Sequence, residues 1–103
     1  MISATGNCVT VDVKRLDDLV PDRMNVSVLK IDTEGADAWV LEGAQRLLLE
    51  RRIQHVFFEC NATRMRQLGI ATSRPTDILN DCGYRVAELK GAAAGTEFYA
   101  VPR

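Results

Sequence analysis

Residues 26–37, with the sequence VSVLKIDTEGAD, decide the fold of this chain. They begin with a short apolar run that ends abruptly in two acids, Asp32 and Glu34, and then in Gly35, after which the pattern becomes helical. A buried parallel strand has this pattern when its carboxyl end delivers polar groups to the edge of a sheet. The segment therefore predicts an α/β fold with a candidate site at the end of a strand over residues 26–31.

The residues on either side of this segment predict further strands and helices. Residues 9–13 alternate as a short strand should, and residues 16–19, followed by Pro21, predict a turn or a single helical turn. From residue 36 to about residue 51 the apolar positions follow helical spacing, so a single long helix is expected there.

The second half of the chain supplies three more strands. Residues 55–60 are aromatic and β-branched and predict a strand parallel to the first, because the long helix between them forms a right-handed crossover. Short helices are expected over residues 63–68 and 75–82. Residues 84–89 and 96–101 predict a C-terminal antiparallel hairpin. Together these elements predict a three-layer α/β fold with a mixed sheet of about five strands.

Size and composition narrow the class of protein. The 103 residues suit one domain over residues 1–103. Hydrophobic residues make up 47% of the chain and the net charge is -1, which argues against disorder and against a nucleic-acid partner. No apolar stretch approaches the ~20 residues of a membrane span, and no signal peptide is recognisable. A cytoplasmic protein without a membrane partner is expected.

The three cysteines indicate neither a metal site nor a disulfide framework. Cys8, Cys60 and Cys82 are widely spaced and form no C-x-x-C pair. We therefore assign no metal ligands among them.

Two consecutive strands end in acids, which makes Asp32, Glu34 and Glu59 the candidate catalytic residues. A carboxylate at such an edge can act as a base, orient a hydroxyl group or hold a metal ion. The alternative is that Asp32 and Glu34 cap the following helix, where an anion is stabilised by about 0.3–1 kcal/mol. Local spacing favours the capping role for Asp32 and Glu34. For Glu59, a solvated position at the end of its strand is as well supported as a catalytic role.

Other polar and aromatic residues have weaker signals. Trp39 is expected to be a packing residue, because the long helix needs a wide apolar face, and the alternative is a platform for a substrate. Arg64, Arg66 and Arg74 form a locally basic region that could meet an anionic substrate such as a nucleotide sugar, although a solvent-facing role is favoured.

The order of several short motifs resembles the C-terminal half of the FkbM family of methyltransferases. The motifs are L-D-D-L at residues 16–19, L-K-I-D-T-E-G-A-D within residues 29–44, F-E at residues 58–59 and G-Y at residues 83–84. The resemblance covers residues 9–85. It departs from the family pattern at Asp37, where a glutamate is usual, and at Trp39, where the usual residue is smaller.

The resemblance implies a Rossmann-like half-domain that uses S-adenosylmethionine and transfers a methyl group to a hydroxyl oxygen of a sugar or secondary metabolite. It implies catalytic roles for Asp32, Glu34 and Glu59, and cofactor contacts for Asp17 and Asp32. The glycine-rich loop and the ribose-binding acid of such domains are not found in residues 1–8. We therefore expect a truncated domain that is inactive by itself and binds the cofactor weakly or not at all.

The competing hypothesis is a non-catalytic, oligomerising interaction domain derived from the same fold. In either case a homodimer is expected, because the strand over residues 26–31 would present an unpaired edge to another chain. Two chains would pair these edges, swap the strand over residues 9–13 or pack the exposed apolar faces of their sheets together. Folding back of that strand onto the edge is the monomeric alternative.

Overall fold

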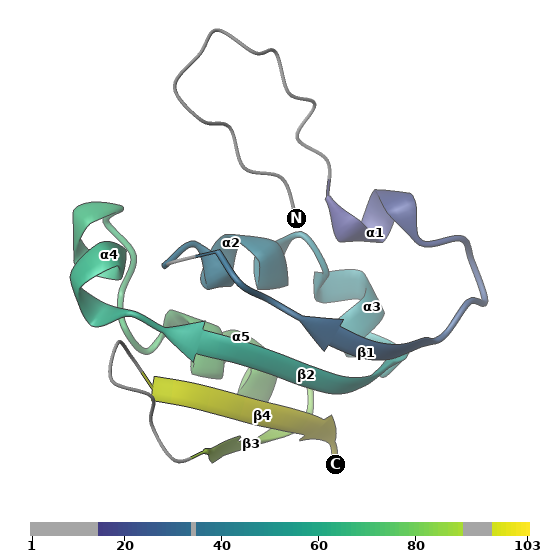
Figure 1. Ribbon diagram of the computed structural model, residues 1–103. Coiled ribbons are helices and arrows are strands. Elements are labelled where there is room, and N and C mark those ends of the chain that lie inside the picture. Colours follow the sequence, from purple (N-terminus) through teal and green to yellow (C-terminus); the bar gives the residue numbers. More distant parts are fainter. Residues whose placement is uncertain (1–14, 34, 90–95) are drawn as a thin grey trace, which may run out of the picture.

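The computed structural model describes residues 15–33, 35–89 and 96–103 (Figure 1). In chain order the elements are α1 (Leu16–Leu19), β1 (Val26–Lys30), α2 (Asp37–Glu42), α3 (Gln45–Leu49), β2 (Ile53–Cys60), α4 (Ala62–Gln67), α5 (Arg74–Asp81), β3 (Tyr84–Glu88) and β4 (Thr96–Pro102). The expected α/β class is confirmed. None of the described helices is long and apolar enough to cross a membrane.

The strands form one mixed sheet in the order β1-β2-β4-β3. β1 and β2 are parallel, as the crossover predicts, and β3 and β4 form the predicted antiparallel hairpin. β4 lies between β2 and β3 and is antiparallel to both. The described sheet therefore has four strands where about five were expected, and the fifth, predicted over residues 9–13, lies outside the described residues.

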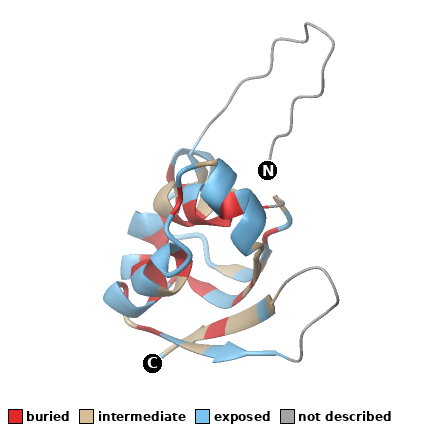
Figure 2. Ribbon diagram, turned by 90° about the vertical axis from the view of Figure 1, so that its left-hand side faces the viewer, coloured by how far each residue is buried: buried red, intermediate tan, exposed pale blue. Residues whose placement is uncertain are grey.

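The helices α2, α3 and α5 pack on one face of the sheet (Figures 1 and 2). The buried side chains lie between these two layers, because each helix turns one apolar stripe toward the sheet. The described residues thus supply two of the three expected layers. The largest buried apolar side chains are Leu41, Leu47, Leu48, Ile53, Val56, Met65, Ile78, Leu79 and Tyr84.

The prediction of one long helix over residues 36–51 is wrong, because the structure divides it into α2 and α3 at Gly43 and Ala44. The cause is Asp17, a residue far away in the sequence. Its carboxylate accepts hydrogen bonds from the backbone amides of Arg46 and Leu47, at 3.0 Å each, and so starts a new helix at that point.

β1 is an edge strand of the described sheet. This edge is the feature on which the predicted homodimer depends, and the dimer itself stays a prediction. The exposed side chain of Val28 adds apolar surface to the same strand.

Candidate active site

Asp32 and Glu59 lie at the same edge of the sheet. The parallel register pairs Lys30 with Phe57, and Asp32 and Glu59 each follow two residues later. The amide of Ile31 donates to the carbonyl oxygen of Phe57 at 2.8 Å, which continues the pairing beyond β1. The structure therefore brings these two predicted site residues together, whereas Glu34 lies outside the described residues.

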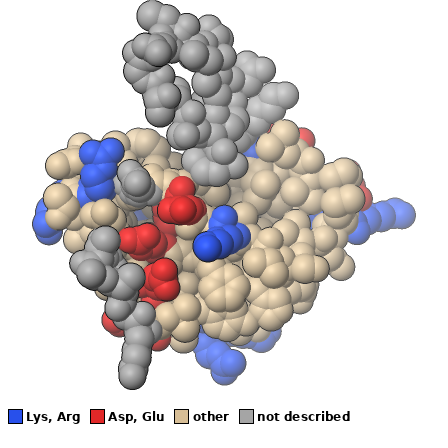
Figure 3. Space-filling model, viewed as in Figure 1, with Lys and Arg blue, Asp and Glu red and all other residues tan. Residues whose placement is uncertain are grey.

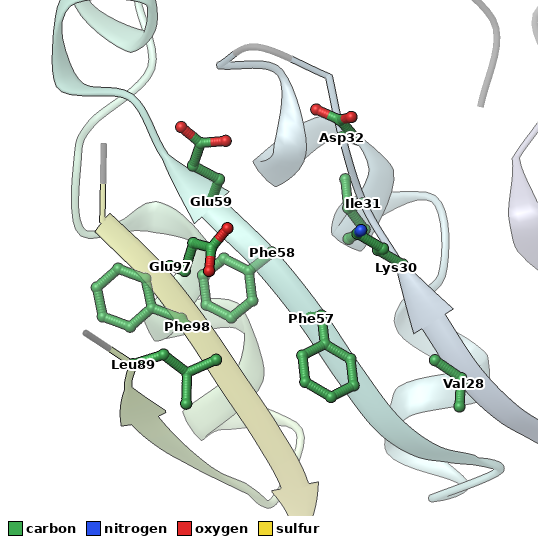
Figure 4. Close-up of a pocket in the computed structure, with 10 residues that line it drawn as sticks. All are labelled: Val28, Lys30, Ile31, Asp32, Phe57, Phe58, Glu59, Leu89, Glu97 and Phe98. Atoms are coloured by element: carbon green, nitrogen blue, oxygen red, sulfur yellow. The ribbon is translucent and has the colours of Figure 1, made fainter. Parts of the chain in front are cut away.

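A third acid, Glu97, joins them from β4. It is paired with Glu59 in the antiparallel register, so that both side chains leave the same face of the sheet (Figure 4). Like charges directly opposite each other destabilise a sheet, so this pair does not contribute to the stability of the fold. Sequence reasoning missed Glu97, because its place depends on the insertion of β4 beside β2.

The three acids line one end of an open groove of about 510 Å³ on the sheet face that the described helices leave uncovered. Acidic side chains gather at this end of the face, with a basic side chain beside them (Figure 3). Lys30 is the basic residue of the lining and Phe57 supplies an aromatic ring (Figure 4), whereas Phe98 stacks on the buried Phe58 and packs against the core. The groove thus combines carboxylates at one end with an apolar floor.

The turn between β1 and α2 is fixed by Gly35 and Asp37. Gly35 has a φ of +112°, and a Cβ atom there would lie 2.6 Å from the Cβ of Arg64 on α4, so that no other residue fits without movement. Asp37 is buried, and its Oδ2 accepts the backbone amide of Glu59 at 2.9 Å. Its Oδ1 accepts the hydroxyl of Thr33.

Asp37 therefore ties the segment that carries Asp32 to the end of β2 that carries Glu59. Burial raises the pKa of Asp37 above its ordinary value of 3.8, and hydrogen bonds from Thr33 and Glu59 act in the opposite direction. The nearby negative charge of Asp32 raises the pKa further. The sequence offered only one indication of this role, namely that Asp37 is an acid two residues after Gly35.

We expect Asp37→Ala to lower the free energy of unfolding by about 1–2 kcal/mol, because it leaves the amide of Glu59 without its acceptor. Asp37→Asn should cost much less, since its amide oxygen can accept from Glu59 and its NH₂ group can donate to Thr33. Urea denaturation of both variants measures the difference. Equal losses would mean that the charge, and not the hydrogen bonds, is what the site requires.

The difference in the free energy of unfolding between Asp37→Asn and the natural protein should depend on pH. Because the pKa of Asp37 is raised in the folded state, its contribution to stability is present below pH 3.8 and is lost as the pH rises through the folded pKa. The stability of Asp37→Asn relative to the natural protein should therefore increase with rising pH in this range.

Asp17 lies elsewhere and has a structural role. Both of its carboxylate oxygens accept amides at the start of α3, and an ion pair with Arg15 at 3.6 Å adds to them. Asp17 is not among the residues that line the groove. Its expected contact with a cofactor stays a prediction.

Within residues 15–33, 35–89 and 96–103, no three histidine, cysteine or acidic side chains are grouped so that they could hold a metal ion. The burial of Cys60 raises the pKa of its thiol to about 11, so this thiol is not activated as a nucleophile. The chemistry that the described groove offers is acid–base chemistry by carboxylates, next to an apolar surface.

A model of the methyltransferase FkbM domain family matches residues 2–86 of the chain. The match confirms the resemblance seen in the sequence. It includes the ends of β1 and β2 with Asp32 and Glu59, and it stops before β4, so Glu97 lies outside it. No curated protein and no solved structure matches the chain.

Proposed function

The chain belongs to the family of FkbM methyltransferase domains, and on this premise we propose that it is a domain of an S-adenosylmethionine-dependent O-methyltransferase. We further propose that its acceptor is a hydroxyl group of a sugar or secondary metabolite. The observation that carries this proposal is the meeting of Asp32 and Glu59 at one end of an open groove.

The proposed chemistry needs a carboxylate at this place. The cofactor, when bound, supplies an electrophilic methyl group. A hydroxyl oxygen that attacks a methyl group loses its proton, and a carboxylate oxygen within hydrogen-bond reach can orient the hydroxyl and accept that proton. Asp32, at the exposed end of β1, is our candidate for this role. Glu59 would accept a second hydrogen bond from the hydroxyl groups of the methyl acceptor.

The charge and shape of the groove fit the proposed ligands. The carboxylates of Asp32, Glu59 and Glu97 complement the positive sulfonium of the cofactor, and aromatic faces attract cations in the same way. Carboxylate oxygens also accept hydrogen bonds from sugar hydroxyl groups. The ring of Phe57 offers an apolar surface against which the less polar face of a sugar can lie.

Cofactor binding by this chain should be weak. Its seven glycines form no G-x-G pattern, and such a loop is what brings the backbone close to a nucleotide cofactor in Rossmann-like folds. We expect a Kd for S-adenosylmethionine above about 100 µM, which corresponds to a few contacts and not to an enclosing site.

Nuclear magnetic resonance titration of the isotope-labelled chain is the appropriate test, because it detects weak binding residue by residue. On addition of S-adenosylmethionine, the backbone signals of Asp32, Glu59 and Glu97 should shift, whereas that of the exposed Asp18 on α1 should not. Unchanged groove signals at millimolar cofactor would contradict the proposed function and favour a non-catalytic domain. Binding near 1 µM would contradict only the expected weakness.

A further inference from the structure

A second cleft lies on the solvent side of α2, away from the sheet. It measures about 470 Å³ and is lined by Arg15, Trp39, Glu42, Gly43, Gln45 and Arg74. Its lining holds two arginines and one glutamate, so its charge is opposite in sign to that of the groove on the sheet. Nothing in the proposed methyl transfer uses it.

Trp39 is the aromatic wall of this cleft. The expectation that it packs in the core is wrong, because 51% of its surface is exposed. The phase of α2 explains the difference, since Ala38 and Leu41 turn inward and Trp39 therefore turns outward. Glu42 follows one turn later, on the same side of the helix.

Glu42 brings the two arginines to this end of α2. The Nε of Arg74 donates to Oε1 of Glu42 at 3.1 Å, and Nη2 of Arg15 donates to the backbone oxygen of Glu42 at 3.2 Å. Their side chains keep 44% and 61% of their surface exposed. A guanidinium has five donors, and within the described residues Arg74 uses only Nε, so further N–H groups are available to the cleft.

We propose that this cleft binds an aromatic anion of the nucleoside phosphate class. The base would stack on the exposed face of Trp39, since stacking on an indole needs only a planar aromatic partner. The phosphate oxygens would accept hydrogen bonds from Arg15 and Arg74, whose planar forks match phosphate geometry. The side-chain amide of Gln45, which also lines the cleft, can pair with the polar edge of the base.

Fluorescence provides a direct test, because Trp39 is the only tryptophan of the chain. Titration with adenosine monophosphate should quench its emission in a saturable way, with a Kd of about 0.1–1 mM. Added salt should weaken the binding, because the guanidinium groups are exposed. Adenosine without phosphate, and inorganic phosphate without a base, should each bind at least about ten-fold more weakly.

Arg74→Gln and, separately, Arg15→Gln should weaken the binding of adenosine monophosphate about ten-fold. Arg66→Gln is the matched control, since Arg66 is an exposed arginine on α4 and does not line the cleft. Circular dichroism of each variant checks that the fold is kept. Absence of saturable quenching up to about 10 mM, or quenching that neither arginine variant changes, would overturn the proposal.

Discussion

Asp32→Asn is expected to lower the rate of methyl transfer by about 100-fold or more, because the amide cannot accept the proton that the acceptor hydroxyl must lose. The substitution changes a single exposed group at the end of β1 and keeps its size. Its effect on the free energy of unfolding should therefore stay within about 0.5 kcal/mol. A large effect on rate with a small effect on stability is the signature of a catalytic carboxylate.

The measurement is the transfer of a labelled methyl group from S-adenosylmethionine at millimolar cofactor. Where the chain turns over too slowly by itself, the cofactor-binding half of a family member is added. Asp18→Asn is the control, since Asp18 is an exposed acid on α1 outside the groove. Equal rates for the two variants would mean that Asp32 only supports the start of the helix that follows.

Asp17→Ala should lower the free energy of unfolding by about 2–4 kcal/mol. The change removes two charge-assisted hydrogen bonds at the start of α3 and leaves the amide of the buried Leu47 without a partner. Loss of the cap also frees the segment at Gly43 and Ala44, where α2 and α3 meet. We therefore expect this to be the most destabilising replacement of an acid in the described part of the chain.

Urea denaturation monitored by circular dichroism measures the loss. Asp17→Asn should have an intermediate effect, because its single oxygen can accept only one of the two amides well. Asp18→Ala, one residue further on, should be almost neutral. If Asp17→Ala were also neutral, the division between α2 and α3 would have to be a property of the local sequence around Gly43.

The sequence predicted the local elements well, for a physical reason. The run that ends at Asp32, the strand that ends at Glu59 and the proline-started helix α5 are all determined by neighbours within a few residues. The parallel pairing of β1 and β2 also follows, because a strand, a helical crossover and a strand have one preferred hand. These steps were enough to place two acids at one edge of the sheet.

Contacts between residues far apart in the sequence could not be predicted from local patterns. The apolar spacing over residues 36–51 is compatible with one helix, and only the tertiary position of Asp17 shows why there are two. The exposure of Trp39 follows from the phase of α2, in which Ala38 and Leu41 face the core, and the apolar spacing did not show which of these neighbouring positions would be buried. Buried polar residues such as Asp37 have no periodic signal, since their role is defined by partners on another element.

By itself, then, the sequence determined the α/β class, the parallel pair of strands and the family, and it predicted that Asp32 and Glu59 lie at one edge of the sheet, because periodicity and strand ends are local properties. Only the tertiary structure decided that β4 enters between β2 and β3, which sets Glu97 opposite Glu59 and completes the acidic end of the groove. It also decided that Asp17 begins a helix, and that Arg15, Trp39 and Arg74 meet in a second cleft. These features depend on which segments pack together, and the balance of burial and hydrogen bonding over the whole chain selects that packing.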